Sequence, residues 1–76
     1  MRLHLGGHLN WYEPQKRARL EIPLAAPTTL LALLEALHVP PGEVAIVTVN
    51  GRLSSLETTV VTDGDRVEVY PALGGG

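Results

Sequence analysis

The residues best suited to chemistry close the chain, which ends in "YPALGGG" with Gly74, Gly75 and Gly76 in succession. Glycine loses the most backbone entropy on ordering, and terminal residues fray unless something holds them. A thread without side chains that ends in a carboxylate suits insertion into a narrow site of another protein. We therefore expect residues 74–76 to form a flexible tail behind a folded domain at 1–73. The alternative is a frayed end or a remnant of cloning.

No other group of residues predicts a reaction centre. The chain has no cysteine, which excludes a disulfide, a thiolate metal site and a nucleophilic thiol. His4 and His8, four residues apart on a strand, would lie about 13 Å from each other, too far to share one metal ion. Asp63 and Asp65 flank Gly64 in a pattern typical of a turn. We expect a protein that is not an enzyme and binds no metal or cofactor of its own.

Length and composition restrict the fold and the partners. Seventy-six residues make one small domain, and with one Trp and two Tyr as the only aromatic residues its core must be aliphatic. A net charge of −2 argues against a nucleic-acid partner. The chain has no apolar run long enough to span a membrane, and its first ten residues, "MRLHLGGHLN", lack the apolar stretch typical of a signal peptide. We expect a cytoplasmic protein that binds neither nucleic acid nor membrane.

The first part of the chain predicts two paired strands. Apolar residues alternate with polar ones over residues 2–11, which predicts a half-buried strand. Gly6 and Gly7 inside it indicate a bulge or a close approach of another backbone. A second alternating run covers 17–24, after a polar loop that contains Pro14. The two runs predict an antiparallel hairpin.

A helix and a buried strand follow. Thr28 or Thr29 can serve as N-cap, and the apolar spacing of "LLALLEALH" predicts a helix of about three turns, ended by Pro40 and Pro41. The β-branched run "EVAIVTVNG" predicts a central strand buried on both faces. Its Asn-Gly ending indicates a tight turn.

The remaining residues complete a mixed sheet. We expect a short strand near Leu53, a turn at 63–65, and a last strand that turns Val67 and Val69 inward. One helix can cover only one face of a sheet, and the first and last strands would pair in parallel at its centre. The predicted fold class is α+β, a β-grasp with a mixed sheet of four to five strands.

Three stretches carry a resemblance to a known family: "LLALLEAL", "VNGR" and "TDGDRVEVYPALGGG". In this order they resemble the ubiquitin-like sulfur carriers of the MoaD/ThiS family, which include the small subunit of molybdopterin synthase and the carrier of thiamine synthesis. The resemblance covers nearly the whole chain. Family members typically end in two glycines, which map onto Gly75 and Gly76, with Gly74 as an additional one before them.

The resemblance implies a function for the tail. In the family, a partner of the ubiquitin-activating type uses ATP to adenylate the terminal carboxylate, here that of Gly76. Sulfur then displaces AMP, and the thiocarboxylate serves a sulfur-acceptor synthase subunit. Gly74 and Gly75 would thread into the partner. The molybdopterin type is favoured over the thiamine type. Two alternatives stay open, namely a protein modifier joined to lysines through Gly76 and an interaction module with an incidental tail.

The resemblance also implies a docking surface. In the family, the sheet face away from the helix, together with residues beside the tail, binds the activating enzyme. The candidate apolar anchors are Tyr70, Leu73 and Leu56, and Arg66 or Glu68 would steer the partner electrostatically.

Overall fold

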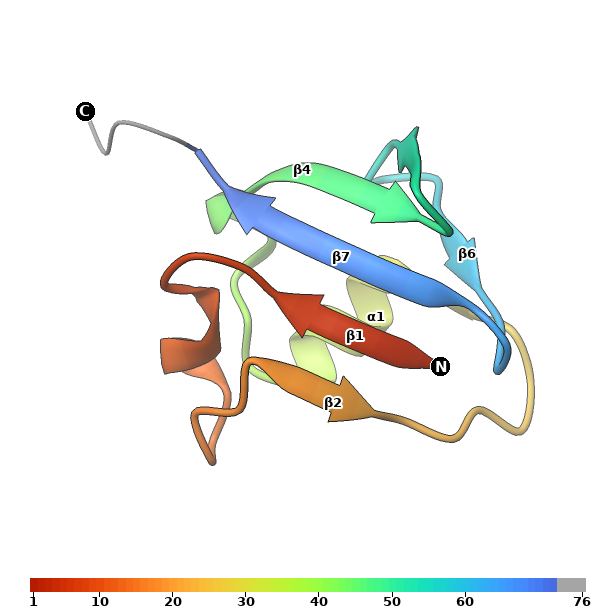
Figure 1. The fold of residues 1–76 in the computed structure, drawn as a ribbon, viewed down its shortest axis with the longest axis horizontal. Coiled ribbons are helices and arrows are strands. Elements are labelled where there is room, and N and C mark those ends of the chain that lie inside the picture. Colours follow the sequence, from red (N-terminus) through yellow and green to blue (C-terminus); the bar gives the residue numbers. More distant parts are fainter. Residues whose placement is uncertain (73–76) are drawn as a thin grey trace.

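Seven strands and one α-helix follow one another through residues 1–72, the part of the chain that the computed structural model describes (Figure 1). Two short 3₁₀ helices, η1 and η2, lie between them. In chain order the elements are β1 (Arg2–Leu5), η1 (Leu9–Tyr12), β2 (Arg19–Glu21), β3 (Thr28–Thr29), α1 (Leu30–Ala36), η2 (Pro41–Glu43), β4 (Val44–Val49), β5 (Arg52–Ser54), β6 (Val60–Val61) and β7 (Arg66–Pro71).

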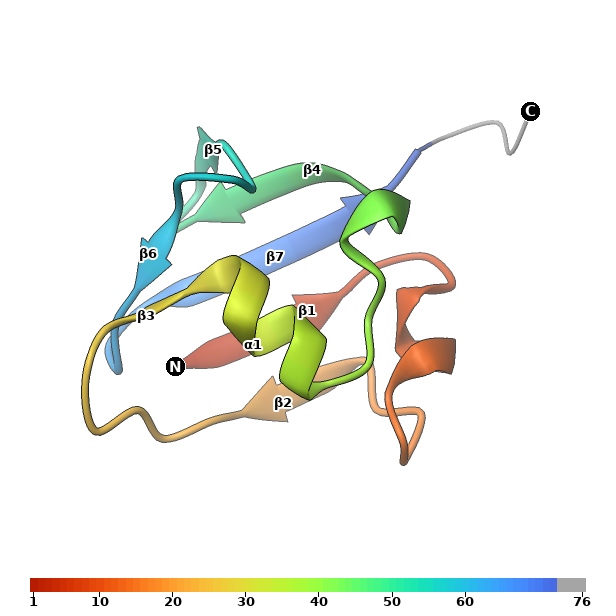
Figure 2. The same cartoon turned by 180° about the vertical axis from the view of Figure 1, so that it is seen from behind.

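Five strands form one mixed sheet in the order β2-β1-β7-β4-β5. The first and last strands, β1 and β7, run parallel at its centre, and the other neighbours pair antiparallel. Helix α1 covers one face of this sheet (Figure 2), and β3 pairs with β6 in a small separate sheet. This arrangement confirms the predicted α+β class and the β-grasp topology. We call the sheet face away from α1 the open face.

The core lies between α1 and the sheet and is aliphatic, as predicted. Leu3 and Leu5 of β1 and Val67 and Val69 of β7 are buried, and Leu34 meets them from the helix side. Full burial of one such side chain contributes about 1.5–3 kcal/mol relative to exposure. The predicted inward parity of β7 is therefore confirmed.

Helix α1 starts as predicted and ends early. The Thr29 side chain caps it by accepting a hydrogen bond from the Ala32 N–H at 3.2 Å. The predicted length of about three turns was wrong, because His38 takes a left-handed φ of 64° right after the helix. The Val39 N–H then donates to the Leu34 carbonyl at 2.9 Å, which closes the helix in a Schellman motif before the prolines. No helix within residues 1–72 is long and apolar enough to cross a membrane.

The first predicted strand was too long. Strand β1 ends at Leu5, because Gly7 has a φ of 55° and the chain turns into η1. The apolar alternation continues by coincidence through this 3₁₀ helix. Leu9 is still buried there, but Trp11 is 67% exposed.

Strand β4 was also predicted incorrectly, since it is not buried on both faces. Val47 faces the helix and is buried, whereas Ile46 on the open face is 41% exposed. The reason is the single helix, which leaves the other side of the strand uncovered. The tight turn after β4 is confirmed, with φ values of 52° at Asn50 and 83° at Gly51.

A buried carboxylate organises the loop between η1 and β2. The Glu13 side chain is only 1% exposed. It accepts hydrogen bonds from the backbone N–H groups of Gln15 and Arg17 at 3.0 and 2.7 Å and from the Arg17 guanidinium at 2.7 Å. The Arg17 side chain is the main cause that lowers the pKa of Glu13. Because the folded state depresses this pKa, ionised Glu13 stabilises the fold above its ordinary pKa of 4.5, and that contribution is lost as the pH falls through the folded value.

We predict that Glu13→Gln lowers the melting temperature by about 5–10 °C near neutral pH, because a neutral amide replaces the charged acceptor. The matched control is Glu35→Gln, whose side chain is exposed on α1 and for which we expect little change. Thermal unfolding should be followed by circular dichroism at about pH 7 and about pH 3. The deficit should shrink at the lower pH, and a deficit that is equal at both would contradict the role given to the carboxylate.

Candidate functional site

Strand β7 carries the chain toward the predicted tail. Its partners hold it on both sides, β1 in parallel register up to Val69 and β4 in antiparallel register up to Pro71. The predicted anchor Leu73 and the tail residues Gly74, Gly75 and Gly76 lie outside the described residues. The structure defines the strand that precedes these residues: β7 is a central strand that is paired with β4 through its last residue, Pro71.

Gly6 and Gly7 pack tightly against the end of β7. The Gly6 N–H donates to the Val69 carbonyl at 2.8 Å. A Cβ on Gly6 would lie 2.2 Å from Cδ1 of Tyr70, and one on Gly7 would lie 2.7 Å from Cγ of Pro71. Neither position has room for a side chain. The close approach that the two glycines predict is therefore confirmed, and its partner is the strand that leads to the tail.

The two 3₁₀ helices lie at the end of the sheet where β7 finishes (Figures 1 and 2). They are joined by a hydrogen bond from the Tyr12 hydroxyl to Oε1 of Glu43, at 3.1 Å. This bond raises the pKa of Tyr12. The segment that follows β1 and the segment that precedes β4 therefore meet near the end of β7.

On the open face, Glu68 is the centre of a polar network. The Tyr70 hydroxyl donates to its Oε2 at 2.9 Å, and Thr48 Oγ1 donates to its Oε1 at 3.0 Å. Nδ1 of His4 lies 3.9 Å from Oε2. The hydrogen bond from Tyr70, followed by that from Thr48, lowers the pKa of Glu68, and the same Tyr70 bond raises the pKa of Tyr70. The Glu68 carboxylate on β7 is therefore ionised, and these two hydrogen bonds fix its position.

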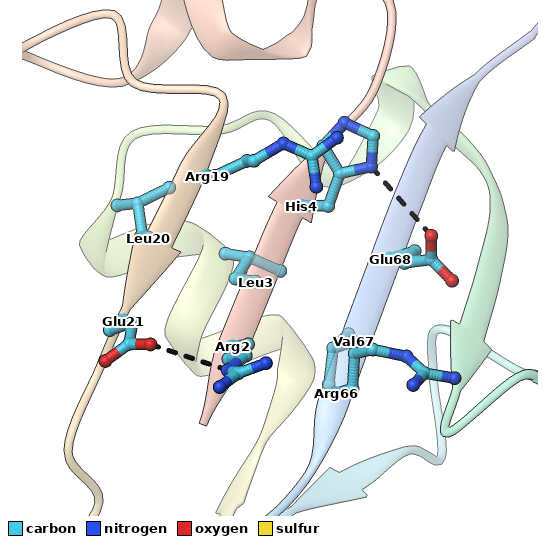
Figure 3. A pocket seen from close by; sticks show the side chains of 9 residues that line it. All are labelled: Arg2, Leu3, His4, Arg19, Leu20, Glu21, Arg66, Val67 and Glu68. Carbon is cyan, nitrogen blue, oxygen red and sulfur yellow. Dashed lines mark ion pairs between the residues drawn. The ribbon is translucent and has the colours of Figure 1, made fainter.

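A shallow groove of about 350 Å³ crosses β2, β1 and β7 beside this network (Figure 3). Its polar lining comes from all three strands: Arg2, His4, Arg19, Glu21, Arg66 and Glu68. Residues 1–72 contain no cluster of three or more side chains suited to hold a metal ion.

The structure brings together three of the predicted docking residues and separates a fourth. Arg66, Glu68 and Tyr70 share the open face along β7. Leu56 instead follows β5, is half-buried, and packs against the core.

Two exposed apolar side chains on this face are not among the predicted docking residues. Ile46 pairs with Tyr70, and Leu53, which is 81% exposed, pairs with Thr48 in the row of Glu68. The β-branched run around Ile46 gave no sign of exposure, because the uncovered face depends on how many helices the fold has. The exposed position of Leu53 follows from its register against β4.

The fold and the departing strand define the class of protein, a ubiquitin-like β-grasp domain. A profile of the Mut7-C ubiquitin family matches residues 2–74, nearly the whole chain. The chain belongs to this family of ubiquitin-like domains, in agreement with the resemblance to MoaD/ThiS-like carriers that its motifs carry. A comparison with curated proteins found no match.

We expect Gly6→Ala to destabilise the domain by about 1–3 kcal/mol, because the new methyl group must displace the Tyr70 ring. Gly64→Ala is the control, since nothing lies within 4 Å of its would-be Cβ. Urea unfolding provides the measurement.

A double-mutant cycle assigns the effect to the ring. In the background of Tyr70→Ala, where the ring is gone, Gly6→Ala should cost much less. If Gly6→Ala lowered the free energy of unfolding equally with and without the ring, the close contact between Gly6 and Tyr70 would not be the cause.

Proposed function

We propose that this chain is a sulfur carrier protein whose Gly76 carboxylate is adenylated by a partner enzyme and converted to a thiocarboxylate. The observation that supports it most is the course of β7. This central strand of a ubiquitin-like sheet is held through Pro71, and two further residues in the sequence separate it from three glycines. A carboxylate that must reach an enclosed site of a partner needs a rigid strand before it and a segment without side chains behind that strand. Strand β7 and the three glycines meet both needs.

The length of the glycine segment agrees with a reaction inside an enclosed site of the partner. Three extended residues span about 10 Å, enough to reach past the surface of a partner into an enclosed site. The absence of Cβ atoms in Gly74–Gly76 permits close approach of the surrounding walls and any backbone conformation they demand. The rigid domain would dock while the last residues enter the site.

The chemistry divides between the two proteins. A carboxylate oxygen of Gly76 attacks the α-phosphorus of ATP, and pyrophosphate leaves. Hydrosulfide supplied by the partner system then attacks the acyl carbon, the C–O bond to AMP breaks, and the product is a thiocarboxylate with free AMP. In this scheme the carrier contributes the reacting group and no catalytic side chain, and ATP is bound by the partner.

We propose that the sulfur goes to a synthase subunit in cofactor biosynthesis. The molybdopterin type is favoured over the thiamine type because the ending "YPALGGG" and the aliphatic composition resemble it more closely. The partners would be an adenylating enzyme of the ubiquitin-activating type and the subunit that accepts the sulfur.

Intact-mass spectrometry tests the proposal. The untagged protein is incubated with lysate of its host, ATP and a sulfide source. We expect a mass gain that equals one oxygen replaced by sulfur, and no gain for a variant that lacks Gly76. The starting mass also establishes whether Gly76 is the last residue of the mature protein.

The other outcomes favour the other functions. No mass change with Gly76 intact would contradict the carrier role. A series of heavier adducts in the same lysate would favour a protein modifier joined to lysine side chains. Loss of residues 75–76 without any phenotype would favour an interaction module.

A further inference from the structure

Strand β2 forms one edge of the main sheet, and within residues 1–72 no strand pairs with its outer side. On its inner side it pairs with β1, and just beyond the strand the Ile22 N–H donates to the Met1 carbonyl at 2.8 Å. In an antiparallel pair, the backbone groups of successive residues point alternately toward the partner strand and away from it. The N–H and carbonyl groups of Arg19 and Glu21 therefore point outward, away from β1.

The outward-pointing donors are limited to these two residues. The Arg17 N–H follows the same alternation, but it donates to the Glu13 carboxylate at 2.7 Å. At the other end of the strand, Pro23 has no N–H to donate. The edge of β2 thus offers a short ladder with donors at Arg19 and Glu21 and with a defined limit at each end.

The side chains of the same two residues carry opposite charges. Arg19 and Glu21 are exposed and line the groove in Figure 3, whereas Leu20 between them is buried. Glu21 lies 3.4 Å from Arg2, but both side chains are largely exposed, and such pairs contribute little. In the described part of the chain, no ion pair within 4.0 Å involves Arg19. The edge therefore presents a cation without a nearby carboxylate and, two residues on, a carboxylate that is only weakly engaged.

We propose that β2 pairs with β2 of a second copy of this chain, antiparallel and centred on Leu20. In this register Arg19 lies opposite Glu21 of the second copy, and Glu21 lies opposite Arg19 of the second copy. Each pair exchanges two backbone hydrogen bonds, so every outward donor of the two strands is satisfied. The contact is self-complementary, as a two-fold symmetric interface must be.

The charges select both the register and the occupant. A shift by two residues in either direction would place Arg19 opposite Arg19 or Glu21 opposite Glu21, and like charges directly opposite are destabilising. An in-register parallel pairing would bring the same like charges together. The edge needs a strand with a carboxylate and a cation two residues apart in reverse order, and β2 itself provides them. Edge strands that resist association often carry lysine, which repels a second copy, and the opposite charges of β2 do the reverse.

The proposed pairing agrees with the rest of the fold. It joins two five-stranded sheets into one, with α1 of both copies on the same side (Figure 2). The two Leu20 side chains meet on that side at the two-fold axis, next to the aliphatic core. The loop between η1 and β2 extends beyond this edge (Figure 1), so it lies beside the segment that follows β2 in the second copy. The two β7 strands end at opposite ends of the joined sheet, so the dimer covers neither of them.

Sedimentation equilibrium of the full chain, from about 10 µM to about 1 mM, tests the proposal. Strand pairing over three residues is a small contact, for which weak association is typical. We expect the mass of the wild type to rise from monomer toward dimer over this range. Arg19→Glu and Glu21→Arg should each weaken dimerisation at least about tenfold, because each places two like-charge pairs in the interface. The matched control is Arg52→Glu on β5, the opposite edge, which makes the same change in net charge as Arg19→Glu and should dimerise like the wild type.

Mixing the two reversal variants tests the register. One variant has carboxylates at positions 19 and 21 and the other has guanidinium groups there, so both cross-strand pairs of a mixed dimer are attractive. We expect the equimolar mixture to dimerise at least as tightly as the wild type, although each variant alone stays monomeric. A mixture of Arg52→Glu with Glu21→Arg controls for attraction by net charge and should not recover the dimer.

The outcomes decide the proposal. All the substituted positions are exposed, so each variant should melt within a few degrees of the wild type, which circular dichroism checks. A wild type that remains a monomer at about 1 mM, or reversal variants that dimerise like the wild type, would overturn the pairing through β2. A mixture of the two reversal variants that stays monomeric would overturn the register centred on Leu20.

Discussion

The parallel pairing of β1 with β7 is the constraint on which the rest of the molecule depends. It joins the two ends of the described chain at the centre of the sheet, with Leu3 next to Val67 and Leu5 next to Val69. Helix α1 packs against these buried pairs. The same pairing fixes the last strand from both sides, so the position from which the terminal residues depart is determined by the core itself.

Local signals in the sequence predicted most of the fold, and they failed where the outcome depended on tertiary context. The Thr29 cap, the Asn50–Gly51 turn and the inward parity of β7 are local properties, and the structure has them. The end of β1 was missed because apolar alternation continues into a 3₁₀ helix. The exposure of Ile46 was missed because a β-branched strand looks the same whether one or two layers cover it.

The candidate site shows the same division. The glycine ending is legible in the sequence, and the glycine pair near the N-terminus indicated a close approach without naming its partner, which is Tyr70 and Pro71. The gathering of Arg2, Arg19 and Arg66 along one groove could not be predicted from the sequence, because strand register brings them together from three strands. A net charge of −2 gives no indication of it.

The most direct test of the carrier role is the mass of the C-terminal peptide in protein purified from its host. Trypsin cleaves after Arg66 and would release a peptide that begins at Val67. We expect this peptide to end at Gly76 and to occur in two forms, which differ by the replacement of one oxygen with sulfur. A peptide that continues beyond Gly76, or a carboxylate form alone in cells with an active sulfur supply, would contradict it.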